Sequence, residues 1–583
     1  MQKGDVLEVK IESVGMDGEG IAKQDGMVIF VPFTLVGEKV KCEITFVKKS
    51  FATAKVIKLL QGSSFRVQPL CPHFRRCGGC DMQHIIYEKQ LEIKRENVVN
   101  CLKKYAGVQV DVNPVVPSKD VYYYRNKAQF PLFEKDGKVC LGFFKEKSHN
   151  FVQIDKCYLL GEWCDKFCEA FLKVSNQLKL TCYNEKTHSG LLRHLVLRKL
   201  NDKVSVTVVV NAKKFDYAEK FVKELSKIGI KFSFYVSFNT KQTNLIMYNA
   251  NVFYGDKDIQ TDISGVKTFV NPMSFMQIND YIRDAIYSKV KELVIQSSVR
   301  IVVDAYSGVG VLTNIVASCA DKVYGIEIVP EATANANQLA KLNGNENIIV
   351  NICGDSAVEL PKLAQQINLQ LAHNHTSEVD LCVEKRLNKD VLHCSQSQNK
   401  NELSSNVKNV LNNQEKTNSI NQKDVASSDI ENCQSFIEQN YSTTEMSQSK
   451  SNQNDCVVDA ENAIVSDHKN KTTAEISSCS LSENNVNNKK FIQENKDNFG
   501  NFIVILDPPR KGCDMPVLQG LLKAQPVKII YISCNPATLA RDLATLKQNY
   551  IISLIQPYDM FPNTSHIETL VCLDRKYFSI VNW

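Results

Sequence analysis

A run of β-forming residues that stops at an Asn-Pro pair constrains the fold of this chain most strongly. Residues 529–532 are apolar, residues 533–536 read Ser-Cys-Asn-Pro, and a helical pattern follows. Proline lacks an N–H group and restricts the residue before it, so the strand should stop there. Cys534 is therefore expected at the carboxyl end of a strand, the edge at which open α/β sheets bind ligands. A thiol there is a candidate nucleophile; the alternative is a buried cysteine that packs as a small apolar side chain.

Two other stretches favour the nucleophile over the packing residue. Residues 507–512 read Asp-Pro-Pro-Arg-Lys-Gly and follow an apolar strand, and residues 565–569 read Ser-His-Ile-Glu-Thr and lead into another. All three stretches place reactive or charged side chains at strand ends, where a doubly wound sheet gathers its site.

Bulk properties exclude several classes of protein. A length of 583 residues suggests three or four domains, and a net charge of +6 permits a nucleic-acid partner without requiring one. No stretch approaches about 18 consecutive apolar residues, and the first residues contain no apolar core of a signal peptide. We therefore expect no transmembrane helix and no secretory signal. Twenty cysteines in such a chain favour metal-binding or catalytic roles over disulfides, and the cytoplasm is the expected location.

Residues 1–59 read as about five short strands broken by glycine, which predicts a small OB-like barrel. Lysines lie near the end of this segment, either as a solvated basic face or as contacts to an RNA backbone. The segment resembles a TRAM domain, a small RNA-binding barrel.

Three cysteines, Cys71, Cys77 and Cys80, lie within ten residues, with two glycines between the last two. Such a group can wrap a compact metal centre, since glycine allows the tight turn. A fourth ligand is needed, and Cys157 is the best candidate. Cys164 and Cys168 are rivals, but their i, i+4 spacing fits one face of an amphipathic helix. Thiolates select zinc or an iron–sulfur cluster, and the spacing leaves both open.

Residues 60–266 read as a β-rich central domain. Helices are expected at 85–105 and near 215–228, and strands at 128–133, 139–144, 191–199, 204–210 and 245–249. Arg125 and Lys127 follow three tyrosines, so this segment could stack on bases and hold phosphate. Core packing explains most of the aromatic residues equally well.

A strand–helix alternation begins after a helix expected at 280–294. Strand 301–304 leads into a loop with Gly308 and Gly310, a helix at 311–320, and strand 322–327, which ends at Glu327. A carboxylate about 20 residues after a Gly-rich turn binds the ribose hydroxyls of a nucleoside. The pattern Asp304-x-x-x-Gly308-x-Gly310 is similar to that of S-adenosylmethionine-dependent methyltransferases. Further strands at 502–507, 528–533, 551–556 and 568–574 and helices at 515–524 and 536–548 predict a doubly wound α/β sheet of seven strands.

Residues 370–499 interrupt this alternation. They are rich in Asn, Ser, Gln, Lys and Glu with few aromatics, which predicts a disordered insertion, because too little apolar surface can be buried to offset the loss of chain entropy. Five cysteines in it, at 382, 394, 433, 456 and 479, show no ligand spacing, although an inserted zinc-binding module is the alternative.

Taken in order, these motifs look like those of the RNA (uracil-5-)-methyltransferase family, in its TRAM-bearing, iron–sulfur-containing branch. The set also includes Phe-Met-Gln-Ile-Asn at 275–279. The resemblance covers the chain apart from the insertion. It implies a Rossmann-like S-adenosylmethionine-dependent methyltransferase domain at 267–583, an N-terminal OB-like TRAM barrel and a β-rich central iron–sulfur domain at 60–266, of which about 91–120 packs on the methyltransferase domain.

The resemblance also assigns roles to residues. It implies that Cys534 is the nucleophile and Glu568 the general base. S-adenosylmethionine is expected to contact Gln277, Tyr306, Glu327 and Asp507, with Asp355 near the adenine. A [4Fe–4S] cluster is expected on Cys71, Cys77, Cys80 and Cys157.

The implied activity is methylation of uridine C5 in RNA to give 5-methyluridine. Large-subunit (23S) ribosomal RNA is the favoured substrate and the T-loop of transfer RNA the alternative. A hypothesis from another class is a non-catalytic RNA-binding or ribosome-assembly protein. A cytosine-C5 methyltransferase is a further alternative. Such an enzyme normally has a proline directly before its nucleophilic cysteine, whereas Ser533 precedes Cys534 here. A monomer is expected.

Overall fold

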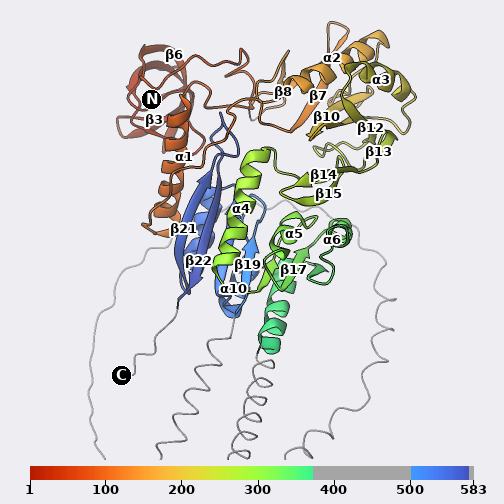
Figure 1. The fold of residues 1–583 in the computed structure, drawn as a ribbon. Coiled ribbons are helices and arrows are strands. Elements are labelled where there is room, and N and C mark those ends of the chain that lie inside the picture. Colours follow the sequence, from red (N-terminus) through yellow and green to blue (C-terminus); the bar gives the residue numbers. More distant parts are fainter. Residues whose placement is uncertain (147, 372–500, 577–583) are drawn as a thin grey trace, which may run out of the picture. The chain divides into compact units, whose positions relative to one another are not determined.

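The computed structural model describes residues 1–146, 148–371 and 501–576 (Figure 1). The described strands form a six-stranded sheet, two seven-stranded sheets and a two-stranded hairpin. The predicted insertion at 370–499 lies outside the described residues, except for 370 and 371, which belong to a helix that begins at 356. Within the described residues, no helix combines the length and the apolar character needed to cross a membrane.

The first sheet matches the barrel predicted at the N-terminus, and it has one strand more than the five expected. Its strand order is β1-β5-β6-β4-β3-β2, with β4 and β6 parallel. Alternate residues of β5, Val40, Cys42 and Ile44, point into the barrel core, as a period of two requires. The strands are β1 Val6–Lys10, β2 Ser13–Val14, β3 Gly20–Gln24, β4 Met27–Val31, β5 Lys39–Val47 and β6 Phe51–Gln61.

The central sheet is covered on one face by two helices. Its order is β13-β12-β11-β10-β7-β8-β9, and aromatic residues of α2 and α3 pack on it. Its elements are β7 Lys127–Lys135, β8 Lys138–Phe144, β9 Phe151–Gln153, α2 Glu162–Gln177, β10 Leu192–Leu200, β11 Lys203–Val210, α3 Ala218–Leu225, η2 Ser226–Ile228, β12 Lys231–Phe238 and β13 Asn251–Tyr254.

One predicted strand of this sheet was wrong, and the strands β9, β12 and β13 were not predicted. The expected strand at 245–249 is a loop, because Asn239 donates its side-chain amide to the carbonyls of Leu245 and Ile246 in place of a strand partner. The strand β12, which was not predicted, lies parallel to β11, and α3 makes the crossover between them. The alternation of apolar and small polar residues in β12 is typical of a strand and could have predicted it.

The third sheet confirms the doubly wound arrangement of seven strands. Its order is β18-β17-β16-β19-β20-β22-β21; the first five strands run parallel, and β22 is antiparallel to both of its neighbours. Its elements are α4 Asp280–Gln296, β16 Ile301–Asp304, α5 Val311–Ala317, β17 Lys322–Glu327, α6 Pro330–Leu342, β18 Ile349–Cys353, β19 Ile503–Leu506, α10 Met515–Ala524, β20 Lys528–Ser533, α11 Pro536–Leu546, β21 Tyr550–Tyr558 and β22 Glu568–Arg575. The hairpin of β14 Ile259–Ile263 and β15 Val266–Val270 precedes them.

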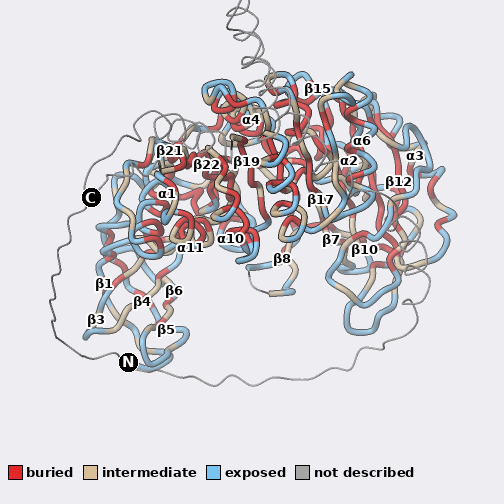
Figure 2. The backbone as a smooth tube through the Cα atoms, turned by 90° about the horizontal axis from the view of Figure 1, so that it is seen from below, coloured by how far each residue is buried: buried red, intermediate tan, exposed pale blue. Residues whose placement is uncertain are grey.

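Both faces of this sheet are buried, as Figure 2 shows along β19 and β22. Neighbouring residues of one strand enter different cores: Val302 packs with α4 and α5, whereas Val303 packs with α10 and α11. A parallel sheet covered on both faces explains the nearly continuous apolar runs of its strands.

The helix α1 Tyr87–Cys101 and the π-helical turn η1 Leu102–Ala106 pack in the same core as α11 and the sheet. Their contact is strengthened by a fully buried ion pair, in which Lys94 Nζ lies 2.5 Å from Asp559 Oδ1. The segment from 98 to 115 therefore contributes to the core of the methyltransferase sheet although it precedes that sheet by about two hundred residues.

Candidate functional site

The antiparallel register of two strands brings Cys534 beside Glu568. Ser533, the last residue of β20, pairs with Thr569 of β22. One step further in the same register sets Cys534 opposite Glu568, the first residue of β22. Glu568 is buried with 2% of its surface exposed, and Cys534 is half-buried. The predicted nucleophile and the predicted base therefore meet at one strand end.

A helix cap fixes the backbone on the other side of Cys534. The Asn535 side chain accepts hydrogen bonds from the amides of Ala537 (3.0 Å) and Thr538 (3.5 Å), and Pro536 occupies the first turn of α11. Asparagine at the N-cap and proline just inside it are strongly preferred at a helix start. The strand ends at Ser533 and the helix cap is Asn535, so Cys534 is held between the two elements.

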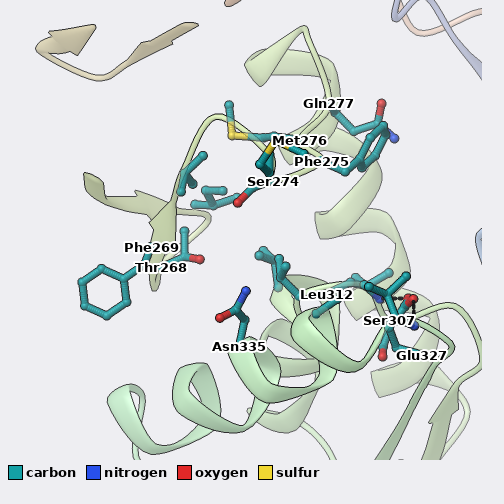
Figure 3. A pocket seen from close by; sticks show the side chains of 18 of the residues that line it. Thr268, Phe269, Ser274, Phe275, Met276, Gln277, Ser307, Leu312, Glu327 and Asn335 are labelled. Carbon is teal, nitrogen blue, oxygen red and sulfur yellow. Dashed lines mark hydrogen bonds between the residues drawn. The ribbon is translucent and has the colours of Figure 1, made fainter. Parts of the chain in front are cut away.

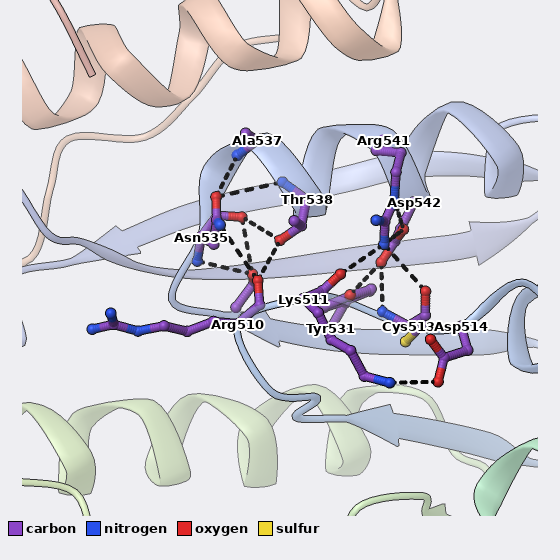
Figure 4. A network of polar contacts seen from close by, with 11 residues as sticks. Arg510, Lys511, Cys513, Asp514, Tyr531, Asn535, Ala537, Thr538, Arg541 and Asp542 are labelled. Carbon is purple, nitrogen blue, oxygen red and sulfur yellow. Dashed lines mark hydrogen bonds and ion pairs between the residues drawn. The ribbon is translucent and has the colours of Figure 1, made fainter. Parts of the chain in front are cut away.

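The loop after β19 is tied to α11 by polar contacts (Figure 4). The carbonyl of Arg510 accepts from the Asn535 amide at 3.3 Å and from the Thr538 hydroxyl at 3.2 Å, and Arg541 donates to the Lys511 carbonyl at 2.9 Å. These bonds use only backbone atoms of the loop, so the Arg510 guanidinium is left to extend away from the network, as the figure shows.

One cavity of about 1000 Å³ joins the residues predicted to act in catalysis and cofactor binding. Side chains at the carboxyl ends of β16, β17, β18, β19 and β20, at the start of β22 and before α4 converge on it. This is the edge of the sheet that the sequence motifs indicated. Its lining includes Gln277, Tyr306, Glu327, Asp355, Asp507, Cys534 and Glu568.

The Gly-rich loop is shaped to meet a ligand. Gly308 and Gly310 have positive φ angles of 55° and 82°, which glycine adopts without strain. A Cβ on Gly310 would lie 3.0 Å from the Cβ of Ala336, so the loop also needs a bare backbone there. Glu327 accepts from the amides of Gly308 at 3.0 Å and Val329 at 2.8 Å. Each of its oxygens keeps a second lone pair for a hydroxyl.

A second cavity of about 650 Å³ shares Gln277, Tyr306, Glu327 and Asp507 with the first. In Figure 3, Phe275, Met276 and Gln277 lie on one side of it and Ser307 and Glu327 on the other. Phe275 is 79% exposed, so its ring does not pack in a core. An exposed aromatic ring at the rim of a polar cavity is suited to stacking on a base.

Charges around the two reactive groups control their protonation. Burial, followed by the charges of Glu568 and Asp507, raises the pKa of the Cys534 thiol to about 11 against the lowering effect of Arg510. Burial, followed by the charge of Asp507, raises the pKa of Glu568 well above its ordinary value. Burial and the neighbouring Asp304 raise the pKa of Asp507 to about 7.

Arg510→Gln is expected to shift the pH–rate profile of this site to higher pH. The thiolate is the reactive form, and its fraction rises tenfold with each pH unit below the thiol pKa. Since Arg510 lowers the pKa of Cys534, removing its charge should raise that pKa by about one unit and reduce the rate at neutral pH by about tenfold. The measurement is the single-turnover rate between pH 6 and 10. Lys523→Gln, an exposed charge change on α10, is the control; an unshifted profile for Arg510→Gln would contradict the assignment.

The four predicted cluster ligands line a separate cavity of about 240 Å³. Cys71, Cys77, Cys80 and Cys157 all face it, whereas Cys164 and Cys168 do not, their sulfurs lying 3.9 Å apart in the core under α2. No group of three or more His, Cys, Asp or Glu side chains in the described part of the chain is arranged to hold a metal ion.

Some residues of the site were missed by sequence reasoning. Arg198 lines the 1000 Å³ cavity and comes from β10 without any local motif, beside Lys127, which the sequence had indicated as a phosphate contact. Arg510 was noted in sequence, but its influence on Cys534 depends on the loop described above. Asp81, next to Cys80, accepts from the Ser565 hydroxyl at 2.8 Å and so links the cysteine segment to the strand that carries Glu568.

Comparisons with known families match three parts of the chain. A model described as tRNA (Uracil-5-)-methyltransferase matches residues 436–576, and the TRAM domain model matches residues 1–57. A model described as TRM5/TYW2 methyltransferase domain matches residues 272–425. The first two agree with the resemblance that the motifs suggested.

Relatives are similar over nearly the whole chain. An uncharacterized RNA methyltransferase of Clostridium acetobutylicum is 28% identical over 99% of this chain and 98% of its own length, and one of Halalkalibacterium halodurans is 28% identical over the same shares. A tRNA (uracil-54, C5)-methyltransferase of Pyrococcus abyssi, solved with S-adenosyl-L-homocysteine, has the same fold, with a TM-score of 0.60 and 22% identity over 97% of this chain and 99% of that one. The site geometry and these matches agree: the chain is an enzyme, an RNA methyltransferase with an N-terminal TRAM domain, and its C-terminal part is similar to the uracil-5-methyltransferase family.

Proposed function

We propose that this enzyme methylates C5 of a uridine in ribosomal RNA, with Cys534 as the nucleophile and Glu568 as the general base. The observation that supports it most strongly is the strand register that sets these two side chains side by side in one cavity with the Gly-rich loop. A non-catalytic RNA-binding protein would not need a buried carboxylate beside a thiol.

The chemistry explains why a thiol is needed. Uracil C5 is too weak a carbon nucleophile to attack a sulfonium methyl group. The Cys534 thiolate adds to C6, forming an S–C6 bond, and the electrons of the C5=C6 bond move toward C5 and O4 as an enolate. C5 then acquires the methyl group, and the thiolate later leaves as the double bond re-forms. Covalent catalysis thus divides one difficult step into easier ones.

Glu568 completes the cycle. After methylation C5 still bears its hydrogen, and the carboxylate removes it as a proton so that the C6–S bond can break. Its position at the start of β22, opposite Cys534, suits a group that must reach C5 while the sulfur holds C6. The pKa of Glu568, raised by burial, favours a carboxylate that accepts a proton readily.

Five residues of the cavities fit the methyl donor. S-adenosylmethionine supplies an electrophilic methyl group when bound. We propose that Glu327 accepts from the ribose hydroxyls and that Asp355, an exposed residue directly before the helix that begins at 356, lies near the adenine. Gln277, Tyr306 and Asp507 line both cavities and are proposed to hold the rest of the molecule.

The target uridine must leave its stack before a thiol can reach C6. Base flipping or a single-stranded loop is therefore required, and the unstacked base can be held by an aromatic face. Phe275, exposed at the rim of both cavities, is proposed to supply that face. The TRAM barrel and the central domain would bind the surrounding RNA.

Methyl transfer to RNA lacking the modification tests the proposal. Labelled S-adenosylmethionine is incubated with the enzyme and with ribosomal or transfer RNA from cells without the gene, and the product nucleotide is mapped. Label in 5-methyluridine of ribosomal RNA supports the proposal. Label in the T-loop of transfer RNA would support the alternative substrate, for which the fold of the Pyrococcus abyssi enzyme is the motivating likeness. Absence of label in both would contradict uridine methylation.

We further propose that Cys71, Cys77, Cys80 and Cys157 hold a [4Fe–4S] cluster. Their convergence on one cavity supports a centre bound by all four thiolates. Four cysteine thiolates would bind one iron each. Iron and acid-labile sulfide analysis of protein purified without oxygen should give four of each per chain; stoichiometric zinc in place of iron would contradict it.

We also propose the domain boundaries that the sequence predicts. The barrel, expected at 1–59, extends to Gln61, and we propose the central domain up to 266 and the methyltransferase domain at 267–583 around the insertion at 370–499. A thiolate nucleophile and thiol ligands need a reducing compartment, so we propose action in the cytoplasm, as a monomer.

A further inference from the structure

Two cations on neighbouring strands of the central sheet face each other without an anionic partner. Lys127 on β7 and Arg198 on β10 are directly opposite in the antiparallel register. Among the described residues neither forms an ion pair, because Asp280, the carboxylate whose charge acts on Arg198, lies 2.5 Å from Arg283 Nη1. Like charges directly opposite on two strands destabilise a sheet. This pair is therefore maintained against its own repulsion.

Burial makes the arrangement more costly. Arg198 is only 2% exposed; within the part of the chain that the structure describes, its Nε has no hydrogen-bond partner and its Nη1 reaches only the Asn271 carbonyl, at 3.5 Å. Burial, with the charge of Arg198, lowers the pKa of Lys127 to about 8. Buried charges in proteins are normally paired, so an anion from outside the chain is the missing partner.

Both side chains point into the catalytic cavity. Ala128 and Phe130 of β7 and Leu197 of β10 enter the core under α2 and α3, so Lys127 and Arg198 lie on the opposite face of the sheet. That face forms part of the wall of the 1000 Å³ cavity that also holds Cys534 and Glu568.

The other three cations of this cavity lie near anionic or thiol groups, and one of them, Lys511, has its Nζ 2.8 Å from Asp514 Oδ2. Arg125 also lines the cysteine cavity and lowers the pKa of Cys157, and Arg510 lowers that of Cys534. Lys127 and Arg198 remain. A guanidinium offers a planar fork of donors and an ammonium a compact charge, which together suit the several oxygens of a phosphate.

We propose that Lys127 and Arg198 form a binding site for a backbone phosphate of the RNA strand, next to the nucleotide that enters the cavity. The inference rests on the proposed function in taking RNA as the ligand. It assigns to these two residues the positioning of the strand, whereas Cys534 and Glu568 act on the base.

The salt dependence of RNA binding tests this site. The full-length protein is titrated with a dodecamer of oligouridylate, without cofactor, at several salt concentrations. Each phosphate contact on a single strand contributes about 0.7 to the slope of log Kd against log salt. Lys127→Gln is expected to reduce that slope by about 0.7, and Lys127→Arg, which keeps the charge, to preserve it. Lys199→Gln, an exposed charge change one residue further along β10, is the matched control.

Three outcomes would overturn the proposal. The slope for Lys127→Gln could equal that of the wild type, or Lys199→Gln could reduce it equally, which would indicate a diffuse field instead of a site. The third is a tenfold or larger loss of S-adenosylmethionine affinity in Lys127→Gln, measured by calorimetry, which would assign the anion to the carboxylate of the methyl donor. Because the oligouridylate titration needs no methyl transfer, a reduced slope in a protein that fails to methylate uridine would retain the phosphate site and reject only the proposed function.

Discussion

Cys534→Ala is expected to reduce methyl transfer by at least about 10⁴-fold, the scale of loss seen when a covalent nucleophile is removed. Without sulfur at this position C6 cannot be attacked, and C5 never becomes an enolate carbon. The fold should persist, because the cap of α11 depends on Asn535 and Pro536 and not on the thiol. The measurement is the single-turnover rate with labelled methyl donor and unmodified RNA.

The control for this substitution is Cys353→Ala, which removes an exposed thiol at the end of β18. It should leave the rate unchanged. A Cys534→Ala protein that still methylates RNA within tenfold of the wild type would reject the covalent mechanism, whatever its product.

Glu568→Gln is expected to trap the enzyme on its RNA. The thiolate can still add to C6 and C5 can still be methylated, but no carboxylate is present to take the C5 proton. The C6–S bond therefore persists, and turnover should fall by about 10²- to 10⁴-fold, the usual contribution of a general base. On a denaturing gel, labelled methyl groups should migrate with a protein–RNA adduct.

The matched control is Glu292→Gln on α4, where an exposed glutamate pairs with Lys289. This protein should turn over normally and show no stable adduct. Free, labelled 5-methyluridine released by Glu568→Gln at the wild-type rate would show that another group removes the proton.

Local sequence predicted the catalytic end of the molecule well because strand ends and helix caps are local. The strand over 528–533 and the helix over 515–524 have the predicted bounds, and Asn535-Pro536 acts as the expected boundary. The residues that follow buried strands fall at one edge because parallel strands align their carboxyl ends. Cys534, Asp507 and Glu327 reach one cavity for that reason.

The remainder depends on contacts between distant segments. In the central sheet, β12 pairs with β11 across a helical crossover. The carbonyls of residues 245 and 246 accept hydrogen bonds from the side-chain amide of Asn239 and not from a neighbouring strand. The opposition of Lys127 and Arg198 follows from a register between strands about seventy residues apart, which no local pattern encodes. The sequence shows that Lys127 and Arg198 are cations, but it does not show that they lie opposite each other.

Because α1 and η1 contribute to the core of the third sheet, they limit which fragments of the protein can fold by themselves. A fragment that starts at 267 would contain every catalytic group yet would leave the apolar side of α11 facing water, since Val98, Leu102 and Ala106 would be gone. Such a truncation should aggregate instead of acting as a minimal catalyst. If RNA-binding modules were exchanged between relatives, α1 and η1 would therefore have to come from the same protein as the methyltransferase sheet.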